Sequence, residues 1–330
     1  MKKRKLRRDL LFAAAILILV LVMLYSGLRI LESTVLRSGA SQEQSHISKT
    51  VTRDGVAYYP RQDITTILVM GIDREGPVEA SDSYRNPGAA DMVAVVVLDQ
   101  TNNCYSILNL NRDMMVEMPV LGIGGKQGGT AFGQLALSHT YGTGLADSAE
   151  NTRATVSGLL LGLDLDYYVA MNMDAIGILN DAVGGVTVNV TEDFSAVDPT
   201  ITKGEITLNR SQAMSFVRSR KDVGTQLNLS RMERHKEYLQ GLAFAVRQKA
   251  EESASFVAEV YDQVDEYMVT DCSLTVLSGF AERYADYPLR EIVTVEGENR
   301  KGGEFYEFYP DREKLDALIL RLFYAPKENQ

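Results

Sequence analysis

The sequence predicts an α/β protein, a three-layer α-β-α domain with a central mixed sheet, preceded by one transmembrane helix. A run of 19 residues without a charge near the N-terminus predicts the membrane helix. After residue 60, short β-branched and aromatic runs alternate with segments of helical spacing. Early strands follow one another closely, whereas later strands are reached through helices. This combination predicts a sheet with both antiparallel and parallel neighbours.

The first predicted element is a membrane anchor. Residues 10–28 read LLFAAAILILVLVMLYSGL, and as a helix they cover about 30 Å of hydrocarbon at about 1.5 Å per residue. The basic flank before them stays in the cytoplasm, which predicts a cytoplasmic tail over residues 1–9 and a transmembrane helix over residues 10–31. A cleaved signal peptide is the alternative, but the run is long for a signal and no Ala-x-Ala pattern follows. The predicted location is therefore the cell membrane, single-pass, with the main domain outside the cytoplasm.

Charge separates the anchor from the rest of the chain. The whole chain carries a net charge of −10, and because residues 1–31 carry +6, the remainder carries −16. An acidic domain argues against nucleic acid as a partner, and any anion that it binds must meet a local cluster of cations. Residues 32–62 are polar and aperiodic and predict an extracytoplasmic stalk, followed by a single domain over residues 63–326.

The elements of that domain follow from hydrophobic periodicity. The predicted strands are Ile64–Met70, Met92–Leu98, Tyr105–Leu110, Tyr167–Met171 and Val186–Val190. The predicted helices are Thr152–Leu161, Met173–Val183, Ser211–Arg220 and Ser230–Ala250. Only residues 99–103 separate the second strand from the third, so these two are expected to form a hairpin.

Two further features carry less information. Cys104 and Cys272 could form a disulfide outside the cell, but two separate apolar residues are the favoured interpretation. The glycine-rich stretch from Leu121 to Thr130 matches neither the dinucleotide-binding nor the P-loop spacing, and we interpret it as a mobile loop.

Two aspartates stand at predicted strand ends. Asp73 follows the run ILVMGI, and Asp91 directly precedes MVAVVVL. Functional sites of α/β sheets lie at strand ends, and two carboxylates there could share one hard divalent cation. An equally good interpretation of these residues alone is that Asp73 belongs to a turn and Asp91 is a solvated strand start.

Arginines gather near the same strand ends. Arg112 follows the run YSILNL and could clamp a phosphate, although pairing with the neighbouring Asp113 is favoured for this segment alone. Arg218 and Arg220 end one predicted helix in FVRSRK, and Arg231 begins the next in LSRMER.

The start of that second helix predicts an anion site. Ser230 and Glu233 have the spacing of a capping box, which places Ser230 at the N-cap and Arg231 in the first turn. A cation is unfavourable there, because the exposed backbone N–H groups already make this end positive. A bound anion would relieve the conflict, so Arg218, Arg220 and Arg231 are predicted to bind a phosphate, with a solvated basic face as the alternative.

His235 lies further along the same helix. The three histidines lack metal-ligand spacing, which disfavours a zinc site. His235 could act as a general acid or base, but a polar residue on the helix surface is the favoured interpretation.

Several segments occur in a specific order. They are the basic anchor, ILVMGIDR, ADMVAVVVLD with YSILNLNRD, SHTYG, LDLDYYVAMNMDAIGILNDAVGGVTVNV, and GEITLNRSQAMSFVRSRK with LSRMERHKEYLQ. This order resembles the LytR-CpsA-Psr family, bacterial enzymes that transfer glycopolymers from a polyprenyl carrier to the cell wall. The resemblance covers roughly residues 64–323.

The resemblance implies a pyrophosphate site. Asp73 and Asp91 would hold Mg²⁺ (or Mn²⁺) on the pyrophosphate. Its oxygens would be bound by Arg112, Arg218, Arg220 and Arg231, with Arg74 adding a contact. The catalytic candidates are these four arginines together with Asn228 and His235. The polyprenyl chain would lie in an apolar tunnel between sheet and helices, with its mouth near the membrane.

The implied activity is that of a Mg²⁺-dependent glycopolymer–peptidoglycan phosphotransferase of cell-wall assembly, acting on teichoic acid or capsule polysaccharide. A wall sugar hydroxyl attacks the sugar-proximal phosphorus, and polyprenyl phosphate leaves. The implied partners are a polyprenyl-pyrophosphate-linked glycopolymer, peptidoglycan and the membrane. The alternatives are a non-catalytic or regulatory module that binds such glycans and a polyprenyl pyrophosphatase.

This sequence departs from the family pattern at several positions. Asn228 stands where Asp is usual, and an amide accepts a hydrogen bond but not a proton. His235 stands where Gln is usual, and Gln134 near where Lys is expected. If the usual Asp acts as a base, activity is reduced, redirected or lost, and this is the motive for the non-catalytic alternative.

Overall fold

The computed structural model describes most of the chain after residue 49. The described residues are 50–122, 125–219, 223, 228–253, 256–272, 276, 280, 283–284, 287–303 and 305–327. The predicted cytoplasmic tail, the transmembrane helix and residues 32–49 of the predicted stalk lie outside them. Among the described helices, none has the length and hydropathy needed to cross a membrane.

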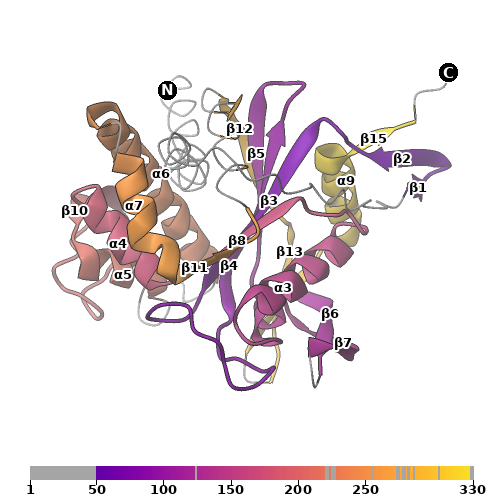
Figure 1. The fold of residues 1–330 in the computed structure, drawn as a ribbon, viewed down its shortest axis with the longest axis horizontal. Helices are drawn as coiled ribbons and strands as arrows, with labels where there is room; N and C mark the ends of the chain where they lie inside the picture. Colours follow the sequence, from indigo (N-terminus) through magenta and orange to yellow (C-terminus); the bar gives the residue numbers. More distant parts are fainter. Residues whose placement is uncertain are drawn as a thin grey trace, which may run out of the picture.

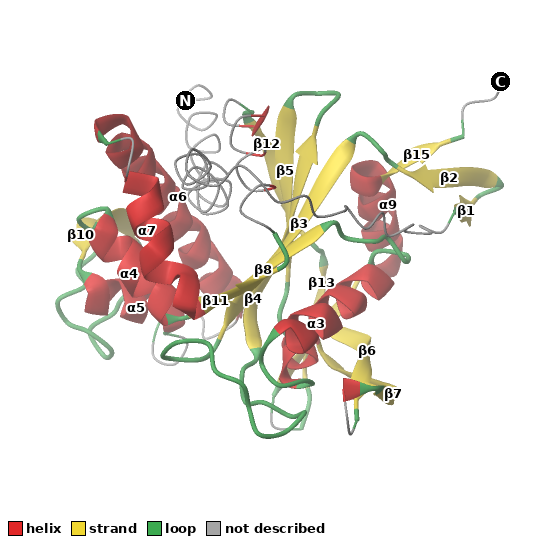
Figure 2. Cartoon of the chain, viewed as in Figure 1, coloured by secondary structure: helices red, strands yellow, loops and turns green. Residues whose placement is uncertain are grey.

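A six-stranded mixed sheet forms the centre of the fold (Figure 1, Figure 2). Its strand order is β11-β8-β3-β4-β5-β12. The bounds are β3 (Ile64–Ile72), β4 (Ala90–Asp99), β5 (Cys104–Leu110), β8 (Tyr167–Asn172), β11 (Met268–Thr270) and β12 (Leu289–Thr294). β3 is antiparallel to β4 and parallel to β8, and β4 is antiparallel to β5. The predicted mixed sheet and the predicted hairpin of its second and third strands are therefore confirmed.

Helices cover both faces of this sheet. The helices α4 (Asp174–Ala182), α5 (Arg210–Arg218), α6 (Asn228–Glu252) and α7 (Phe256–Val264) lie on one side, and α3 (Ala146–Leu159) and α9 (Arg312–Phe323) on the other (Figure 1). Alternate residues of β3 belong to different cores: Ile67 and Val69 pack on the first side, Leu68 and Met70 on the second. This two-residue alternation of an almost wholly apolar strand is what a sheet covered on both faces requires.

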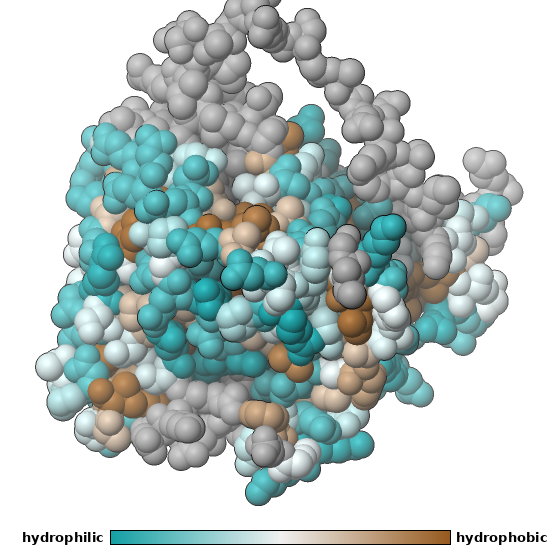
Figure 3. All heavy atoms as spheres, turned by 60° about the horizontal axis from the view of Figure 1, so that its bottom comes forward, coloured by the Kyte–Doolittle hydropathy of each residue, from teal (hydrophilic) through white to brown (hydrophobic). Residues whose placement is uncertain are grey.

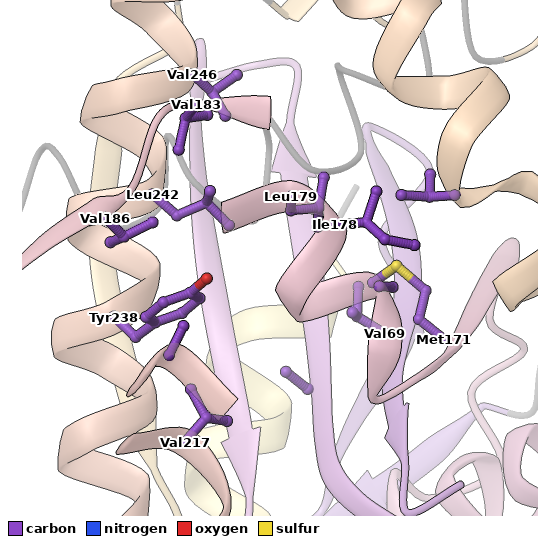
Figure 4. Packing of buried hydrophobic residues seen from close by; sticks show 14 of the residues in the cluster. Val69, Met171, Ile178, Leu179, Val183, Val186, Val217, Tyr238, Leu242 and Val246 are labelled. Carbon is purple, nitrogen blue, oxygen red and sulfur yellow. The ribbon is translucent and has the colours of Figure 1, made fainter. Parts of the chain in front are cut away.

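The first core joins α4 and α6 to the sheet. Figure 4 shows Tyr238 and Leu242 of α6 extending toward Leu179 of α4, with Val69 and Met171 of the strands nearby. α6 also approaches β9 (Val186–Val190) closely at Gly241, where an added Cβ would lie 2.2 Å from the Thr187 carbonyl oxygen. A side chain at this position would therefore push the helix away from the strand.

Smaller sheets surround the central one. They are β1 (Val51–Arg53) with β2 (Val56–Pro60) and β15 (Tyr324–Pro326), β6 (Met115–Leu121) with β7 (Gln127–Gln134), β9 with β10 (Gly204–Leu208), and β13 (Gly297–Lys301) with β14 (Tyr306–Pro310). Two 3-10 helices, η2 (Leu135–Thr140) and η3 (Asp265–Tyr267), lie outside these sheets. Residues 51–60 of the predicted stalk thus form the hairpin of β1 and β2, and β2 also pairs with β15.

Three predictions about the elements are wrong. The glycine-rich stretch is not simply a loop, because residues from Gln127 onward form β7, whose backbone pairs with β6 without needing apolar side chains. α3 begins at Ala146, six residues before its predicted start, because its first turns bury polar side chains such as Asn151, which donates to the Ser138 carbonyl at 2.7 Å. α6 begins at Asn228, so Ser230 lies inside the helix and is not its N-cap.

Candidate functional site

The charged residues predicted at strand ends meet at one edge of the central sheet, the lower edge in Figure 1. Ile72, at the end of β3, pairs both with Ala90 at the start of β4 and with Asn172 at the end of β8. Asp73, just after β3, and Asp91, near the start of β4, therefore lie at neighbouring strand ends. Figure 3 shows that the face of the molecule at this end of the sheet is mostly hydrophilic.

Asp91 is the centre of a buried charge cluster. Its Oδ1 accepts a hydrogen bond from Nη1 of Arg112, and its Oδ2 accepts one from Nη1 of Arg231 at 2.8 Å. The side chains of Asp91, Arg112 and Arg231 are only 9%, 16% and 5% exposed. The interpretation of Asp91 as a solvated strand start is therefore wrong. Nε of Arg112 also lies 3.5 Å from Oδ1 of Asp113, so Arg112 contacts both carboxylates.

Asp91 also resolves the conflict that the sequence posed at Arg231. A cation in the first turn of a helix is unfavourable unless an anion lies close by. The sequence predicted a bound phosphate in this role, and the structure places the carboxylate of Asp91 there. A phosphate that binds Arg231 must therefore compete with Asp91 or arrive together with a cation that occupies Asp91.

A second, more exposed cluster surrounds Arg218, the last residue of α5. Its Nη1 donates to Oε1 of Glu75 at 2.5 Å, and its Nη2 donates to Oδ1 of Asp73 at 3.4 Å. The hydrogen bond to Glu75 is the main cause of a raised Arg218 pKa. The Arg218 side chain is 38% exposed, so a ligand can reach it from solvent. Glu75 was not predicted, because nothing in its local sequence separates it from a solvated loop acid.

The buried Arg234 holds the end of α5 on which Arg218 stands. Its Nε donates to the Phe216 carbonyl at 3.0 Å, its Nη2 to the Ser219 carbonyl, and its Nη1 to the Glu192 carboxylate. These bonds satisfy carbonyls that the last turn of a helix leaves unpaired. Sequence reasoning missed this role, although the spacing of three residues from Arg231 places both arginines on one helix face.

His235 lies between α6 and the end of α5, not on the helix surface as predicted. Its Nε2 is 3.0 Å from the Val217 carbonyl oxygen, so Nε2 carries the hydrogen and donates. Burial lowers its pKa to about 4, with a further lowering by Arg231. The imidazole is therefore neutral near pH 7, and Nδ1 carries the lone pair.

An apolar pocket begins beside this charged edge. Asp91 and His235 contribute to its lining, and the other walls include Met171, Ile176, Leu179, Tyr238, Leu239 and Leu242. The pocket lies between the sheet and the helices α4 and α6, in the packing shown in Figure 4. Its cavity volume of about 80 Å³ corresponds to roughly two or three water molecules at about 30 Å³ each.

The remaining predicted site residues divide into described and undescribed ones. Arg220 lies outside the described residues, and so does the side chain of Asn228, whose backbone opens α6. Arg74 is exposed and makes no ion pair within the described part of the chain. Nε2 of Gln134 donates to the Tyr306 carbonyl at 2.8 Å and to Oδ1 of Asp113 at 3.3 Å.

Neither cysteine is bonded to the other. Cys104 and Cys272 are both buried and free, as the favoured interpretation held. The described residues contain no group of three or more His, Cys, Asp or Glu side chains placed to hold a metal ion.

Comparison with known proteins gives consistent results. The model of the LytR_cpsA_psr family matches residues 30–322. A relative from Bacillus subtilis (strain 168), polyisoprenyl-teichoic acid–peptidoglycan teichoic acid transferase TagU, is 26% identical over 242 residues, covering 73% of this chain and 71% of the relative. The protein of the same name from Oceanobacillus iheyensis is 26% identical over 296 residues, covering 86% and 84%.

Solved structures share the fold. Protein gbs0355 from Streptococcus agalactiae superposes with a TM-score of 0.64 at 24% identity, covering 79% of this chain and 86% of that one. TagV from B. subtilis gives a TM-score of 0.59 at 23% identity, covering 79% and 96%. The mixed α/β arrangement is thus common to this chain and to those proteins.

Proposed function

This chain belongs to the LytR_cpsA_psr family, and from that premise we propose that it transfers an anionic glycopolymer from a polyprenyl-pyrophosphate carrier to peptidoglycan during cell-wall assembly. The observation that carries the proposal is the position of Asp91 and its two arginines at the end of an apolar pocket. A polyprenyl pyrophosphate combines a hydrocarbon chain with an anionic head. A pocket with apolar walls and charged groups at one end suits such a molecule. The TagU relatives are named as transferases of teichoic acid to peptidoglycan, which agrees with this assignment.

The charges of the site indicate how the head group binds. In the described part of the site, each of three arginines is paired with a carboxylate. Arg112 and Arg231 pair with Asp91. Arg218 pairs with Glu75 and Asp73. A pyrophosphate alone would meet those carboxylates as like charges. It binds favourably only if a cation neutralises the acids at the same time.

The acids present fit such a cation. Asp73 and Asp91 offer carboxylate oxygens from adjacent strand ends, and Mg²⁺ is commonly bound by one or two carboxylates together with phosphate oxygens. Asp73 and Asp91 would hold Mg²⁺ (or Mn²⁺), and the bound cation would neutralise the negative charge of the phosphates. If the cation takes the place of the arginines on Asp91, the guanidinium groups of Arg112 and Arg231 can turn toward the phosphate oxygens.

The reaction depends mainly on positioning and charge. An acceptor hydroxyl of the wall attacks the sugar-proximal phosphorus, the P–O bond to the polyprenyl phosphate breaks, and the hydroxyl proton passes to the leaving phosphate or to water. Arg112, Arg218 and Arg231 stabilise the negative charge that grows on the phosphate oxygens, and Arg220 and Arg74 extend this set. His235 is a weak base with a pKa of about 4, so its part is to orient the end of α5. Asn228 can accept a hydrogen bond from the acceptor but cannot remove its proton.

The carrier chain requires the apolar pocket to widen. The cavity of about 80 Å³ is much smaller than the roughly 300 Å³ at which ordinary ligand pockets begin. The chain enters if α4 and α6 separate, so that the side chains of Ile176 and Leu239 move apart. A membrane anchor over residues 10–31, with the domain outside the cytoplasm, would keep this pocket near the lipid surface that supplies the carrier.

Reconstitution tests the proposal. The full-length chain in lipid vesicles is incubated with a polyprenyl-pyrophosphate glycan, Mg²⁺ and peptidoglycan fragments, and labelled wall product and released carrier phosphate are measured. Product formation that depends on the acceptor supports transfer. Release of carrier phosphate without an acceptor identifies a pyrophosphatase, and tight binding without turnover identifies a non-catalytic module.

A matched pair of variants accompanies the assay. Arg218→Ala removes an exposed arginine of the site and should reduce transfer at least about a hundredfold while leaving the fold intact. Arg321→Ala removes an exposed arginine that pairs with Glu291 on another part of the surface and should leave transfer unchanged. Equal transfer by both variants would contradict the assignment of Arg218.

A further inference from the structure

A polar pocket lies on the opposite side of the sheet edge from the apolar pocket. Arg74, Glu79, Ser81, Asp82, His139 and Asn172 contribute to its lining, and its cavity volume is about 300 Å³. Asn172, at the end of β8, lines both this pocket and the apolar one. The polar pocket therefore begins where the site for the carrier ends.

Hydrogen bonds fix the loop that forms this pocket. Nδ2 of Asn86 donates to the His139 carbonyl at 2.8 Å and to Oγ of Ser148 at 3.0 Å. The backbone N–H of Val78 donates to the Glu266 carbonyl at 2.7 Å, and that of Ser81 to the Thr143 carbonyl, also at 2.7 Å. The pocket wall is thus bonded to three separate parts of the chain, so the pocket is a formed feature of the fold.

The charges in the pocket favour a neutral ligand. Arg74 contributes one positive charge and Glu79 and Asp82 two negative charges, and none of the three makes an ion pair with another described residue. Arg74 directly follows Asp73 in the sequence and adjoins the proposed pyrophosphate site, so Glu79 and Asp82 set the charge of the rest of the pocket, which disfavours a second anion. Carboxylates that lack a cationic partner are strong acceptors for hydroxyl groups.

His139 adds an acceptor in the wall. The residue is 2% exposed, and Nδ1 lies 2.9 Å from the Gly88 carbonyl oxygen, to which it donates. Nε2 is then an acceptor, and it has no hydrogen-bond partner among the described residues. Burial lowers the His139 pKa, so the ring stays neutral. A buried acceptor without a partner is a costly feature, and because Nε2 itself has almost no accessible surface, a ligand hydroxyl group satisfies it only if the pocket wall shifts.

We propose that this polar pocket binds a neutral, hydroxyl-rich pyranose, namely the acceptor sugar of the wall glycan. The inference rests on the proposed function and specifies its acceptor side. Arg74 directly follows Asp73, and consecutive Cα atoms are about 3.8 Å apart, so a sugar in the pocket has its hydroxyl groups close to the proposed pyrophosphate site. The carrier chain, the pyrophosphate and the acceptor then follow one another across the sheet edge, as an in-line attack on phosphorus requires.

The volume agrees with one sugar ring. Pockets for small ligands begin at about 300 Å³, so this cavity is too small for a long glycan strand. One residue of the glycan would occupy it while its neighbours lie on the surface outside. The first sugar of the carrier-bound polymer has the same chemistry, and the experiment separates the two sources.

The test compares two double variants of the full-length chain in vesicles. Glu79→Ala with Asp82→Ala removes the carboxylates of the pocket, and both side chains are exposed, so the fold is kept. Glu205→Ala with Glu313→Ala removes two exposed acids from β10 and α9 as the control. The acceptor is a GlcNAc–MurNAc oligosaccharide whose lactyl carboxylates are converted to amides, so that the probe is neutral, and KM is measured separately for acceptor and carrier.

The pocket variant should raise the acceptor KM about tenfold, the effect of losing one or two hydrogen bonds to hydroxyls. Its carrier KM should stay within about twofold of the carrier KM of the control. An unchanged acceptor KM overturns the inference. So does a raised carrier KM, which would place the carrier-bound sugar in the pocket.

A binding measurement keeps this result separate from the proposed function. Saturation-transfer NMR of the same oligosaccharide is recorded with the unaltered chain and with both double variants. Loss of the signal in the pocket variant alone supports the inference even if no preparation turns over. Equal signals in all three, or binding only when a peptide stem is attached, overturn it.

Discussion

Arg231 and Asp91 are 140 residues apart in sequence and form a hydrogen-bonded ion pair of 2.8 Å in which both side chains are almost fully buried. The pair joins the first turn of α6 to the first residues of β4. Since Arg112 takes the other oxygen of Asp91, one carboxylate ties two arginines from different elements to the sheet edge. The same side chain is thus both a structural link and a candidate metal ligand.

The first prediction concerns the charge of Asp91. Asp91→Asn keeps the shape but leaves Arg231 opposite an amide, and breaking such a buried pair costs about 3 kcal/mol. We expect a lower free energy of unfolding by about that amount in urea denaturation, together with loss of transfer. Asp316→Asn is the control, because its pair with Arg53 is exposed and should be worth less than about 1 kcal/mol. Equal destabilisation by the two changes would refute the role given to Asp91.

The sequence predicted those parts of the fold that apolar runs define. β3, β4, β5 and β8 were found within a few residues because their side chains are buried on both faces, which produces continuous apolar runs. β13 was missed, because every residue of GENRK is exposed and only backbone pairing with β14 makes it a strand. Strands of this kind leave no periodicity to detect.

The sequence named the candidate site residues one by one but not their contacts. Asp73, Asp91, Arg112, Arg218 and Arg231 were named as candidates, and the structure shows that each of them forms an ion pair at the same end of the sheet. Their pairing was not predicted, because the partners are far apart in sequence and only the sheet register brings them together. Arg234 and Glu192 were missed because their partners are also far apart in sequence. Arg234 donates to carbonyl oxygens at the end of α5 and to the Glu192 carboxylate.

The second prediction tests Arg234 as a positioning residue. Lysine keeps the charge but cannot donate to Phe216, Ser219 and Glu192 at once, so Arg234→Lys should release the end of α5 and displace Arg218. We expect kcat to fall about tenfold while the chain stays folded at the assay temperature. Arg210→Lys changes an exposed arginine at the other end of the same helix, paired with Asp181, and should leave kcat unchanged. A kcat for Arg234→Lys equal to that of the unaltered chain would show that Arg234 does not position Arg218.

The third prediction concerns the pH dependence of stability. His235 has a pKa of about 4 in the folded protein against about 6.5 when unfolded, so the unfolded chain binds the additional proton first as pH falls. Its contribution to stability is complete above about pH 6.5 and is lost as pH falls toward 4. His235→Gln can still donate to the Val217 carbonyl but does not titrate. Urea denaturation between pH 7 and pH 4 should show a loss smaller by on the order of 2 kcal/mol in this variant, and parallel curves would contradict the assignment.

The last prediction uses the length of the carrier chain to test the apolar pocket. Leu239 of α6 is partly buried and lines this pocket, so Leu239→Trp should fill space that the polyprenyl chain needs. Leu318→Trp is the control, because Leu318 is a partly buried residue of α9 that packs against the core on the opposite face of the sheet. If the chain lies between α4 and α6, Leu239→Trp should raise the KM for a long-chain carrier about tenfold, which corresponds to about 1.4 kcal/mol of lost binding. A carrier with one or two isoprene units does not extend far into the pocket, so its KM should change by less than about twofold.

The measurement is the ratio of the two KM values in each variant. An equal rise for both carriers would show that the tryptophan disturbs the charged edge itself, and no rise for either would place the carrier chain outside this pocket.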